Sequence, residues 1–220
     1  MCQLQRVPYR EALDLQHRLR DERQADRIGD TLLLLEHDPV YTRGRRSEAS
    51  DLPVGTGIEV VDVDRGGKVT YHGPGQLVGY PVMATADVVA HVRAMERAII
   101  AALADEGIEA RSRAAEGRDF TGVWVEDRKI ASIGVHVQRG VTTHGFAVNV
   151  DCDLTPFGRI VPCGLPSVEM TSIARERPGA DMRCFRKRMA HRFAEAFERR
   201  QRLVSEHRLM SANAPAPATL

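Results

Sequence analysis

The stretch Arg65-Gly66-Gly67-Lys68-Val69-Thr70-Tyr71-His72-Gly73-Pro74-Gly75-Gln76 is the part of the chain that says most about its fold and its use. Five of its twelve residues are glycine or proline, and among them stand an arginine, a lysine, a threonine, a tyrosine and a histidine. Glycine lets a backbone approach a ligand closely, and loops that carry polar side chains on a rigid scaffold commonly serve binding or catalysis. The composition of this segment, called the binding loop below, therefore predicts a ligand site.

The binding loop does not match the known nucleotide-binding loops. It has neither the G-x-x-x-x-G-K-[ST] spacing of a phosphate loop nor the G-x-G-x-x-G of dinucleotide folds. The four cysteines lie far apart, with no C-x-x-C and no cysteine and histidine at zinc spacing. We expect no metal site and no nucleotide cofactor.

Two further motifs follow the binding loop: Arg128-Lys129-Ile130-Ala131-Ser132-Ile133-Gly134 and Val161-Pro162-Cys163-Gly164-Leu165. The three segments together resemble, nearly residue for residue, the octanoyltransferases that begin protein lipoylation. The resemblance runs from about Leu32 to about Ile173. It implies a mixed-sheet fold like the catalytic domain of biotin and lipoate protein ligases.

The resemblance also implies a reaction and its partners. An octanoyl group would move from octanoyl-acyl carrier protein to the ε-amine of a lipoyl-domain lysine. The acceptors would be the lipoyl domains of 2-oxo acid dehydrogenase E2 subunits and the glycine cleavage H protein. A thioester donor is already activated and the amide product is more stable, so the transfer needs neither ATP nor a cofactor.

Cys163 is the expected nucleophile. It stands between Pro162 and Gly164, a context typical of a sharply turned loop, and a reactive thiol needs partial exposure and a nearby positive charge. Cys152 is flanked by two aspartates, which would raise its pKa, so it is the weaker candidate. Cys184 falls in an expected helix. The alternative that Cys163 is an inert buried residue stays open on the residues alone.

Lys129 is the expected catalytic partner of Cys163. The chain is rich in arginine but has only three lysines, Lys68, Lys129 and Lys187, and lysine can lose its proton when desolvated. Lys129 follows the turn at Asp127, and on its position alone it reads as a solvated turn residue. The resemblance implies instead that its ammonium stabilises the Cys163 thiolate and moves the proton.

Three strips are expected to contact the substrate, carried over by the resemblance. Their residues are Arg65, Gly66, Gly67, Lys68, Val69, Thr70, Tyr71, His72, Ser132, Ile133, Gly134, Gly145, Phe146 and Ala147. Small residues in these strips, among them Gly134 and Gly145, would open a slot for the eight-carbon chain, with Val69, Tyr71 and Ile133 as its walls. His72 and His144 either orient a substrate group or assist proton transfer, or they are structural histidines whose hydrogen bonds are made within the protein. Both alternatives stay open on the sequence.

The expected fold class is α+β, or mixed α/β, because strands come in blocks with few helices. Residues 1–210 should form one domain and residues 211–220, rich in alanine and proline, a disordered tail. Helices are expected at Arg10–Arg27, Asp87–Glu106 and Met182–Leu209. Strands are expected at Thr31–Leu35, Ile58–Val63, Gln76–Met83, Gly122–Glu126, Lys129–Gln138 and Thr142–Val150, and a loop at Pro39–Asp51.

Composition sets limits on partners and location. The formal charge of +1 gives no electrostatic case for nucleic acid. No apolar run approaches the roughly 18 residues of a membrane span, and the first residues show no signal-peptide core. We therefore expect a cytoplasmic protein without a nucleic-acid or membrane partner.

Two rival functions remain. An ATP-dependent lipoate or biotin ligase of the same fold would bind an acyl-adenylate and would not need Cys163. A non-catalytic module that binds acyl carrier protein could use the arginines of the last helix, although such a run is more often a solvated face.

Overall fold

The computed structural model describes residues 1–205 of the chain, except residue 54 and residues 161–167. Its α-helices are α1 (Tyr9–Gln24), α2 (Val88–Ala104), α3 (Ile173–Glu176) and α4 (Met182–Ala196). Its strands are β1 (Cys2–Arg6), β2 (Thr31–Glu36), β3 (Val40–Arg43), β4 (Val60–Asp62), β5 (Thr70–His72), β6 (Gln76–Val82), β7 (Arg111–Ser112), β8 (Gly122–Val125), β9 (Arg128–Gln138) and β10 (Val141–Asn149). Short 3-10 turns include η1 (Ala49–Asp51), η3 (Arg118–Phe120) and η4 (Thr155–Arg159).

The centre of the molecule is a mixed sheet. Within the described residues it has seven strands in the order β1-β2-β6-β10-β9-β8-β7. The β1–β2 pair is parallel and the other pairs are antiparallel. This arrangement confirms the predicted mixed α/β class.

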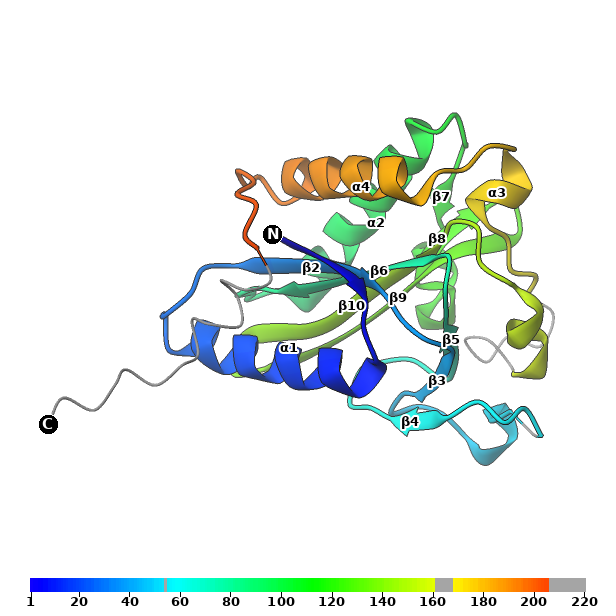
Figure 1. Cartoon of the computed structure of the whole chain (residues 1–220), viewed down its shortest axis with the longest axis horizontal. Helices are drawn as coiled ribbons and strands as arrows, with labels where there is room; N and C mark the ends of the chain where they lie inside the picture. The colour runs from blue at the N-terminus through cyan, green and yellow to red at the C-terminus, as the bar shows by residue number, and fades with distance from the viewer. Residues whose placement is uncertain (54, 161–167, 206–220) are drawn as a thin grey trace, which may run out of the picture.

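Helices cover both faces of this sheet. In Figure 1, α2 and α4 lie over one face and α1 over the other. The run Leu32–Leu35 in β2 explains the layering, because successive strand residues point to opposite faces. Leu32 and Leu34 pack in the α2–α4 core, whereas Leu33 and Leu35 pack in the α1 core. A strand buried on both sides therefore reads as a continuous apolar run.

A second sheet of three strands, in the order β4-β3-β5, lies at one end of the large sheet (Figure 1). Its central strand β3 lies where we expected a loop over Pro39–Asp51, so that expectation is wrong. Val40 and Tyr41 are β-branched and aromatic, residue types that suit strands, and the pairing with β4 and β5 supplies the ladder. The charged residues after Arg43 favoured the prediction of a loop over this short strand. The binding loop joins the two sheets: β4 of the small sheet ends shortly before it, β5 of the small sheet lies within it, and its last residue, Gln76, begins β6 of the large sheet.

The helix at Asp87–Glu106 is confirmed as α2. The Asp87 side chain caps it by accepting hydrogen bonds from the backbone N–H groups of Val89 and Ala90, at 2.9 and 3.0 Å. The last helix is shorter than expected, because α4 ends at Ala196 and not at Leu209. Glu198 takes a left-handed conformation with φ 52°, which turns the chain out of the helix.

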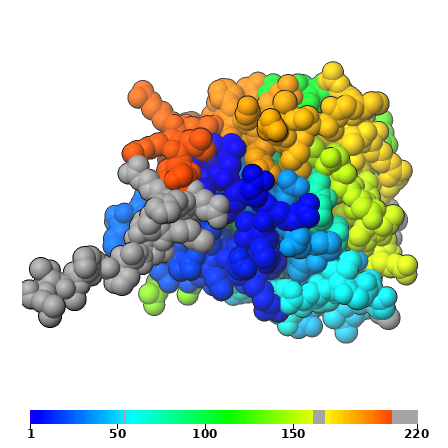
Figure 2. Space-filling view, viewed as in Figure 1, coloured from blue at the N-terminus to red at the C-terminus, as the bar shows by residue number. Residues whose placement is uncertain are grey.

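After this turn the chain runs back to the N-terminus. The Val204 backbone N–H donates to the Met1 carbonyl at 2.9 Å, and Figure 2 shows the two segments side by side on the surface. None of the described helices has the length and apolar character needed to cross a lipid bilayer.

Candidate active site

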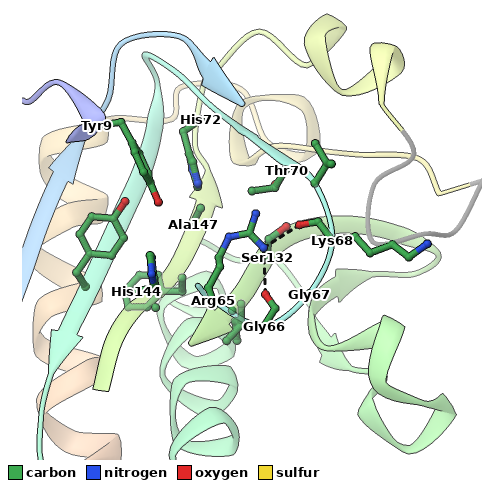
Figure 3. A pocket seen from close by; sticks show the side chains of 16 residues that line it. Tyr9, Arg65, Gly66, Gly67, Lys68, Thr70, His72, Ser132, His144 and Ala147 are labelled. Carbon is green, nitrogen blue, oxygen red and sulfur yellow. Dashed lines mark hydrogen bonds between the residues drawn. The ribbon is translucent and has the colours of Figure 1, made fainter. Parts of the chain in front are cut away.

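The binding loop packs across β9 and β10 and forms a pocket with them (Figure 3). The pocket holds about 510 Å³ of empty space, part of it open to solvent. Every residue of the three predicted strips except Tyr71 lines it, together with Tyr9, Tyr80 and His144. The structure thus brings the binding loop together with strands that lie 60 or more residues further along the chain.

Tyr71 faces away from this pocket. In β5 successive side chains alternate between faces, so Thr70 and His72 point into the pocket and Tyr71 to the other side. Its ring lies 5.4 Å from that of Tyr41 and 5.6 Å from that of Phe157, measured between centroids. The expectation that Tyr71 forms a wall of the slot is therefore wrong, and Tyr71 belongs to a satellite core beneath the small sheet.

Arg65 anchors the binding loop. Its guanidinium is buried and donates to the carbonyls of Gly66 and Lys68, at 3.0 and 2.8 Å (Figure 3). It also donates to the carbonyl and hydroxyl of Thr42 in β3, at 2.8 and 2.7 Å. Arg65 therefore fixes the loop to the small sheet and leaves a positive charge in the pocket wall.

His72 is held as a neutral imidazole with a defined tautomer. The Gln76 amide N–H groups donate to the Tyr71 carbonyl at 3.2 Å and to Asn149 Oδ1 at 2.9 Å, which turns Gln76 Oε1 toward His72. His72 Nδ1 lies 2.7 Å from that oxygen and must carry the proton. Burial lowers the pKa of His72 to about 3, and the nearby His37 adds to this. Its Nε2 is therefore an acceptor at neutral pH.

The same hydrogen bonds reach toward Lys129. Asn149 Nδ2 donates to the Thr171 carbonyl at 2.9 Å, and the Thr171 N–H donates to the Lys129 carbonyl at 3.0 Å. Gln76, Asn149 and Thr171 are all buried. A continuous polar chain therefore joins the pocket histidine to the strand that carries Lys129, and fully satisfied buried networks of this kind rigidify a site.

An aromatic group closes the inner end of the pocket. Tyr9, His37, His72 and Tyr80 have ring centroids 5.0 to 5.9 Å apart in four pairs. His37 Nδ1 donates to the Val7 carbonyl at 2.7 Å, so its Nε2 accepts from the Tyr80 hydroxyl at 2.7 Å. Burial lowers the pKa of His37 to about 4. This end of the pocket is thus uncharged at neutral pH.

His144 lies at a strained position in β10. Its φ is 60°, a left-handed value that costs a non-glycine residue energy and is often found at functional sites. Its Nε2 lies 2.7 Å from the Asp64 carboxylate, which also pairs with His136 at 3.3 Å. The backbone N–H of His144 donates to Gln16 Oε1 at 2.7 Å. The hydrogen bond from His144 holds the pKa of Asp64 well below its usual range, and burial lowers the pKa of His144 itself.

Lys129 is buried, with 1% of its surface exposed. Its Nζ donates to the Thr121 carbonyl at 2.8 Å and lies 5.2 Å from the centroid of the Trp124 ring. The reading of Lys129 as a solvated turn residue is therefore wrong. The Lys129 N–H donates to the Glu169 carbonyl at 2.8 Å, so the chain that follows residues 161–167 pairs with this lysine.

Cys163 lies outside the described residues. Of the other cysteines, Cys2 and Cys152 are buried and Cys184 is exposed, and among the described residues none of the three forms a disulfide. The pKa of Cys152 is raised to about 12, chiefly by burial, with Asp151 and Asp153 adding to it. The expectation that the pKa of Cys152 is raised is confirmed, although burial matters more than the flanking carboxylates. Its lower reactivity relative to Cys163 stays a prediction.

Two glycines that we expected to open the slot serve close packing. A Cβ at Gly134 would lie 2.9 Å from the Gly66 carbonyl oxygen, and a Cβ at Gly145 would lie 2.2 Å from that of Gly79. Gly134 thus lets the binding loop approach β9, and Gly145 lets β10 approach β6. Ala147 is the small residue whose side chain faces the pocket beneath His72 (Figure 3).

Comparison with known proteins identifies the family. A family model described as the lipoyl protein ligase A/B catalytic domain matches residues 8–194. The chain belongs to this family. The octanoyltransferase of Acidothermus cellulolyticus is 52% identical over 178 residues, which cover 77% of this chain and 78% of that protein. The octanoyltransferase of Mycobacterium tuberculosis is 51% identical over 180 residues, covering 79% and 76%. This member of the family is therefore an enzyme of the octanoyltransferase kind.

Solved structures confirm the predicted fold of the lipoyl protein ligase A/B family. A structure of an archaeal lipoylation system from Thermoplasma acidophilum, with a bi-partite lipoate protein ligase, matches with a TM-score of 0.71 and 18% identity. That match covers 96% of this chain and 89% of the other. Biotin protein ligase from Aquifex aeolicus matches with a TM-score of 0.52 and 10% identity, covering 90% and 69%.

Sequence reasoning missed two residues that line the pocket, Tyr9 and Tyr80, and two that contact lining residues, His37 and Asp64. Tyr9 opens α1, whose other buried residues are aliphatic except Gln16, and His37 follows the apolar strand β2. Only Asp64 offered a signal, because it directly precedes the binding loop. The pairing of these residues depends on contacts between distant segments, which one sequence does not display.

Proposed function

We propose that this protein transfers an octanoyl group from octanoyl-acyl carrier protein to a lipoyl-domain lysine through a thioester on Cys163. The observation that carries the proposal is the burial of Lys129 beside the pocket, on a strand paired with the residues that follow the Cys163 motif. The Lys129 amine donates to the Thr121 carbonyl and lies near the Trp124 ring, and a desolvated lysine of this kind can give up its proton more readily than a lysine in water. Membership of the octanoyltransferase group supports the same reaction.

In the first step the Cys163 thiolate attacks the carbonyl carbon of the donor thioester. A new carbon–sulfur bond forms, the bond to the carrier thiol breaks, and the proton taken from Cys163 passes by way of Lys129 to the departing thiolate. In the second step the ε-amine of the acceptor lysine attacks the acyl-enzyme. The amide bond forms, the bond to Cys163 breaks, and the amine proton returns to the sulfur. The scheme predicts ping-pong kinetics.

The pocket would hold the acyl chain between the binding loop and β10. Burial of six or seven methylenes at about 0.8 kcal/mol each gives roughly 5 kcal/mol of gross binding. The neutral His72 and His37 support this assignment, because an uncharged aromatic end suits an alkyl tail. Backbone N–H groups near Cys163 would stabilise the transient oxyanion.

The acceptors that we propose are the lipoyl domains of 2-oxo acid dehydrogenase E2 subunits and the glycine cleavage H protein. Each acceptor lysine is carried by a folded domain. Its amine would therefore enter through the side of the pocket that is open to solvent. We infer that the enzyme serves this first step of lipoylation in the cytoplasm.

Intact mass after incubation with octanoyl carrier protein tests the proposal. We expect a gain of one octanoyl group that maps to Cys163 and is lost on addition of a lipoyl domain. Cys163→Ala should abolish both the adduct and transfer, while Cys152→Ala, whose thiol is buried and weakly acidic, should keep the adduct.

Near wild-type transfer by Cys163→Ala would overturn the covalent route. Release of pyrophosphate from ATP and lipoate would instead assign the protein to the ligases of the same fold.

A further inference from the structure

A groove borders the acyl pocket on the side of α2. The pocket and the groove share Gly66, Gly67, Lys68, Ile133 and Gly134, so the two hollows adjoin along the binding loop and β9. Beyond this border, the groove is lined by residues that do not touch the pocket: Arg46, Val88, Val92, Arg118, Asp119, Thr121 and Val135. We call it the α2 groove.

Positive charge gathers at the side of the α2 groove away from the pocket. Arg46 and Arg118 are both exposed. Arg46 pairs with Asp119 at 2.9 Å, with side chains 43% and 42% exposed, so solvent screens this ion pair. Arg118 makes no ion pair with any residue in the described ranges. The charge of Lys68, by contrast, is already held by Asp51 at 3.3 Å, and its side chain extends away from the pocket (Figure 3).

The remaining wall of the α2 groove is apolar. Val88 is 41% exposed at the start of α2, and Val92 and Val135 lie close by in the lining. The α2 groove thus combines an apolar wall with the positive charges of Arg46 and Arg118.

The α2 groove also passes Lys129. The carbonyl of Thr121, which lines the groove, accepts the hydrogen bond from Lys129 Nζ at 2.8 Å. A molecule that lies in the groove and continues into the pocket would therefore cross beside the amine that we assign to catalysis.

We propose that the α2 groove binds the phosphopantetheine arm of the acyl donor, with its phosphate at Arg46 and Arg118. The arm carries a phosphodiester, a dimethyl group and a terminal thioester, which match the two arginines, the valine wall and the border with the acyl pocket. The phosphate takes the place of Asp119 at Arg46 and gives Arg118 a counter-charge. This assignment rests on the proposed function, because it needs a thioester donor of this chemistry.

Three octanoyl donors test the assignment: octanoyl-pantetheine, octanoyl-phosphopantetheine and octanoyl carrier protein. Wild type should show a higher kcat/KM with the phosphorylated arm than with the unphosphorylated one. The double variant Arg46→Ala, Arg118→Ala should lower kcat/KM for both phosphorylated donors by about tenfold, the equivalent of about 1.4 kcal/mol. The ratio of kcat/KM for octanoyl-phosphopantetheine to that for octanoyl-pantetheine should therefore fall toward one. Arg45→Ala, an exposed arginine outside the groove lining, is the matched control and should keep the wild-type ratio.

A double variant that keeps the wild-type ratio and melts like wild type would overturn the assignment. A loss seen with the carrier protein but not with the free phosphorylated arm would also overturn it, since the arginines would then contact the carrier itself. Transfer by wild type from none of the three donors would overturn the proposed function, and this result is distinct from either of the others.

Discussion

Among single residues, Lys129 allows two catalytic roles of a lysine to be distinguished by mutation. A lysine can stabilise a thiolate by its charge alone, or it can also carry the proton, and arginine at working pH can do only the first. We expect Lys129→Arg and Lys129→Ala each to lower kcat/KM by about a hundredfold or more, the usual contribution of general acid–base catalysis. Steady-state transfer from octanoyl carrier protein measures this.

The alkylation rate of Cys163 as a function of pH is the companion measurement. If Lys129→Arg keeps a reactive thiolate yet does not transfer, Lys129 moves the proton. Substantial transfer by Lys129→Arg would show that charge alone suffices.

Ala147 should set the length of the accepted chain. Ala147→Val adds two carbons that face the pocket and displace about two methylenes of substrate. At about 0.8 kcal/mol each, this lowers octanoyl affinity by roughly fifteenfold, while a butanoyl donor loses much less. The measurement is the ratio of octanoyl to butanoyl transfer.

Val148→Ile is the control for Ala147→Val, because Val148 is the next residue in β10 and packs on the opposite face of the sheet. An unchanged ratio in Ala147→Val would remove Ala147 from the acyl site. The same test at Gly134 would be ambiguous, since a side chain there meets the backbone of the binding loop first.

At the scale of the element, a charged clamp holds the chain segment that pairs with Lys129. Arg128 donates to both oxygens of Glu176 at 3.0 and 3.1 Å, and the Thr171 hydroxyl donates to Glu176 at 2.5 Å. We expect Glu176→Gln to lower the free energy of unfolding by about 1–2 kcal/mol and to lower transfer as well. Denaturant unfolding at pH 7 measures the first effect.

Glu169→Gln offers a matched control in the same segment. Glu169 pairs with Arg175 at 3.1 Å, but both side chains are more than half exposed, so its loss should change stability by less than about 0.5 kcal/mol. Equal effects of the two variants would mean that the clamp at Glu176 does not hold the segment.

The sequence predicted those elements whose signal is local. Asp87 marks the start of α2, and the leucines of β2 indicate a strand buried on both faces. It did not predict β3, which needs β4 and β5 as neighbours, or the end of α4, where Glu198 turns the chain back toward Met1. The candidate site followed the same rule: the strips came from motifs, while Tyr9 and Tyr80 became visible only in the folded chain.

At the scale of the whole molecule, buried neutral histidines tie stability to pH. Burial lowers the pKa of His37 and His91 to about 4 and that of His72 to about 3. An unfolded chain protonates these side chains near pH 6.5, whereas the folded protein keeps them neutral. Stability is therefore fully present above pH 6.5 and falls as the pH drops toward 4, with each histidine contributing a loss of about 1–2 kcal/mol at pH 5.

The free energy of unfolding at pH 7 and pH 5 measures this loss. His91→Leu is the informative variant, because His91 packs against Phe197 and does not line the pocket. This variant should reduce the loss of unfolding free energy between pH 7 and pH 5 by the contribution of one histidine, about 1–2 kcal/mol. An unchanged difference would show that His91 does not stay neutral in the folded protein.

The pocket draws its lining from the start of α1, the binding loop, β6, β9 and β10, which span most of the chain from Tyr9 to Ala147. These parts meet only when segments far apart in the sequence have packed together. Contacts between such distant segments form late, because long loops must close before they become favourable. Recovery of transfer during refolding therefore reports completion of the whole tertiary structure. The rate at which activity returns then measures the rate of the final folding step.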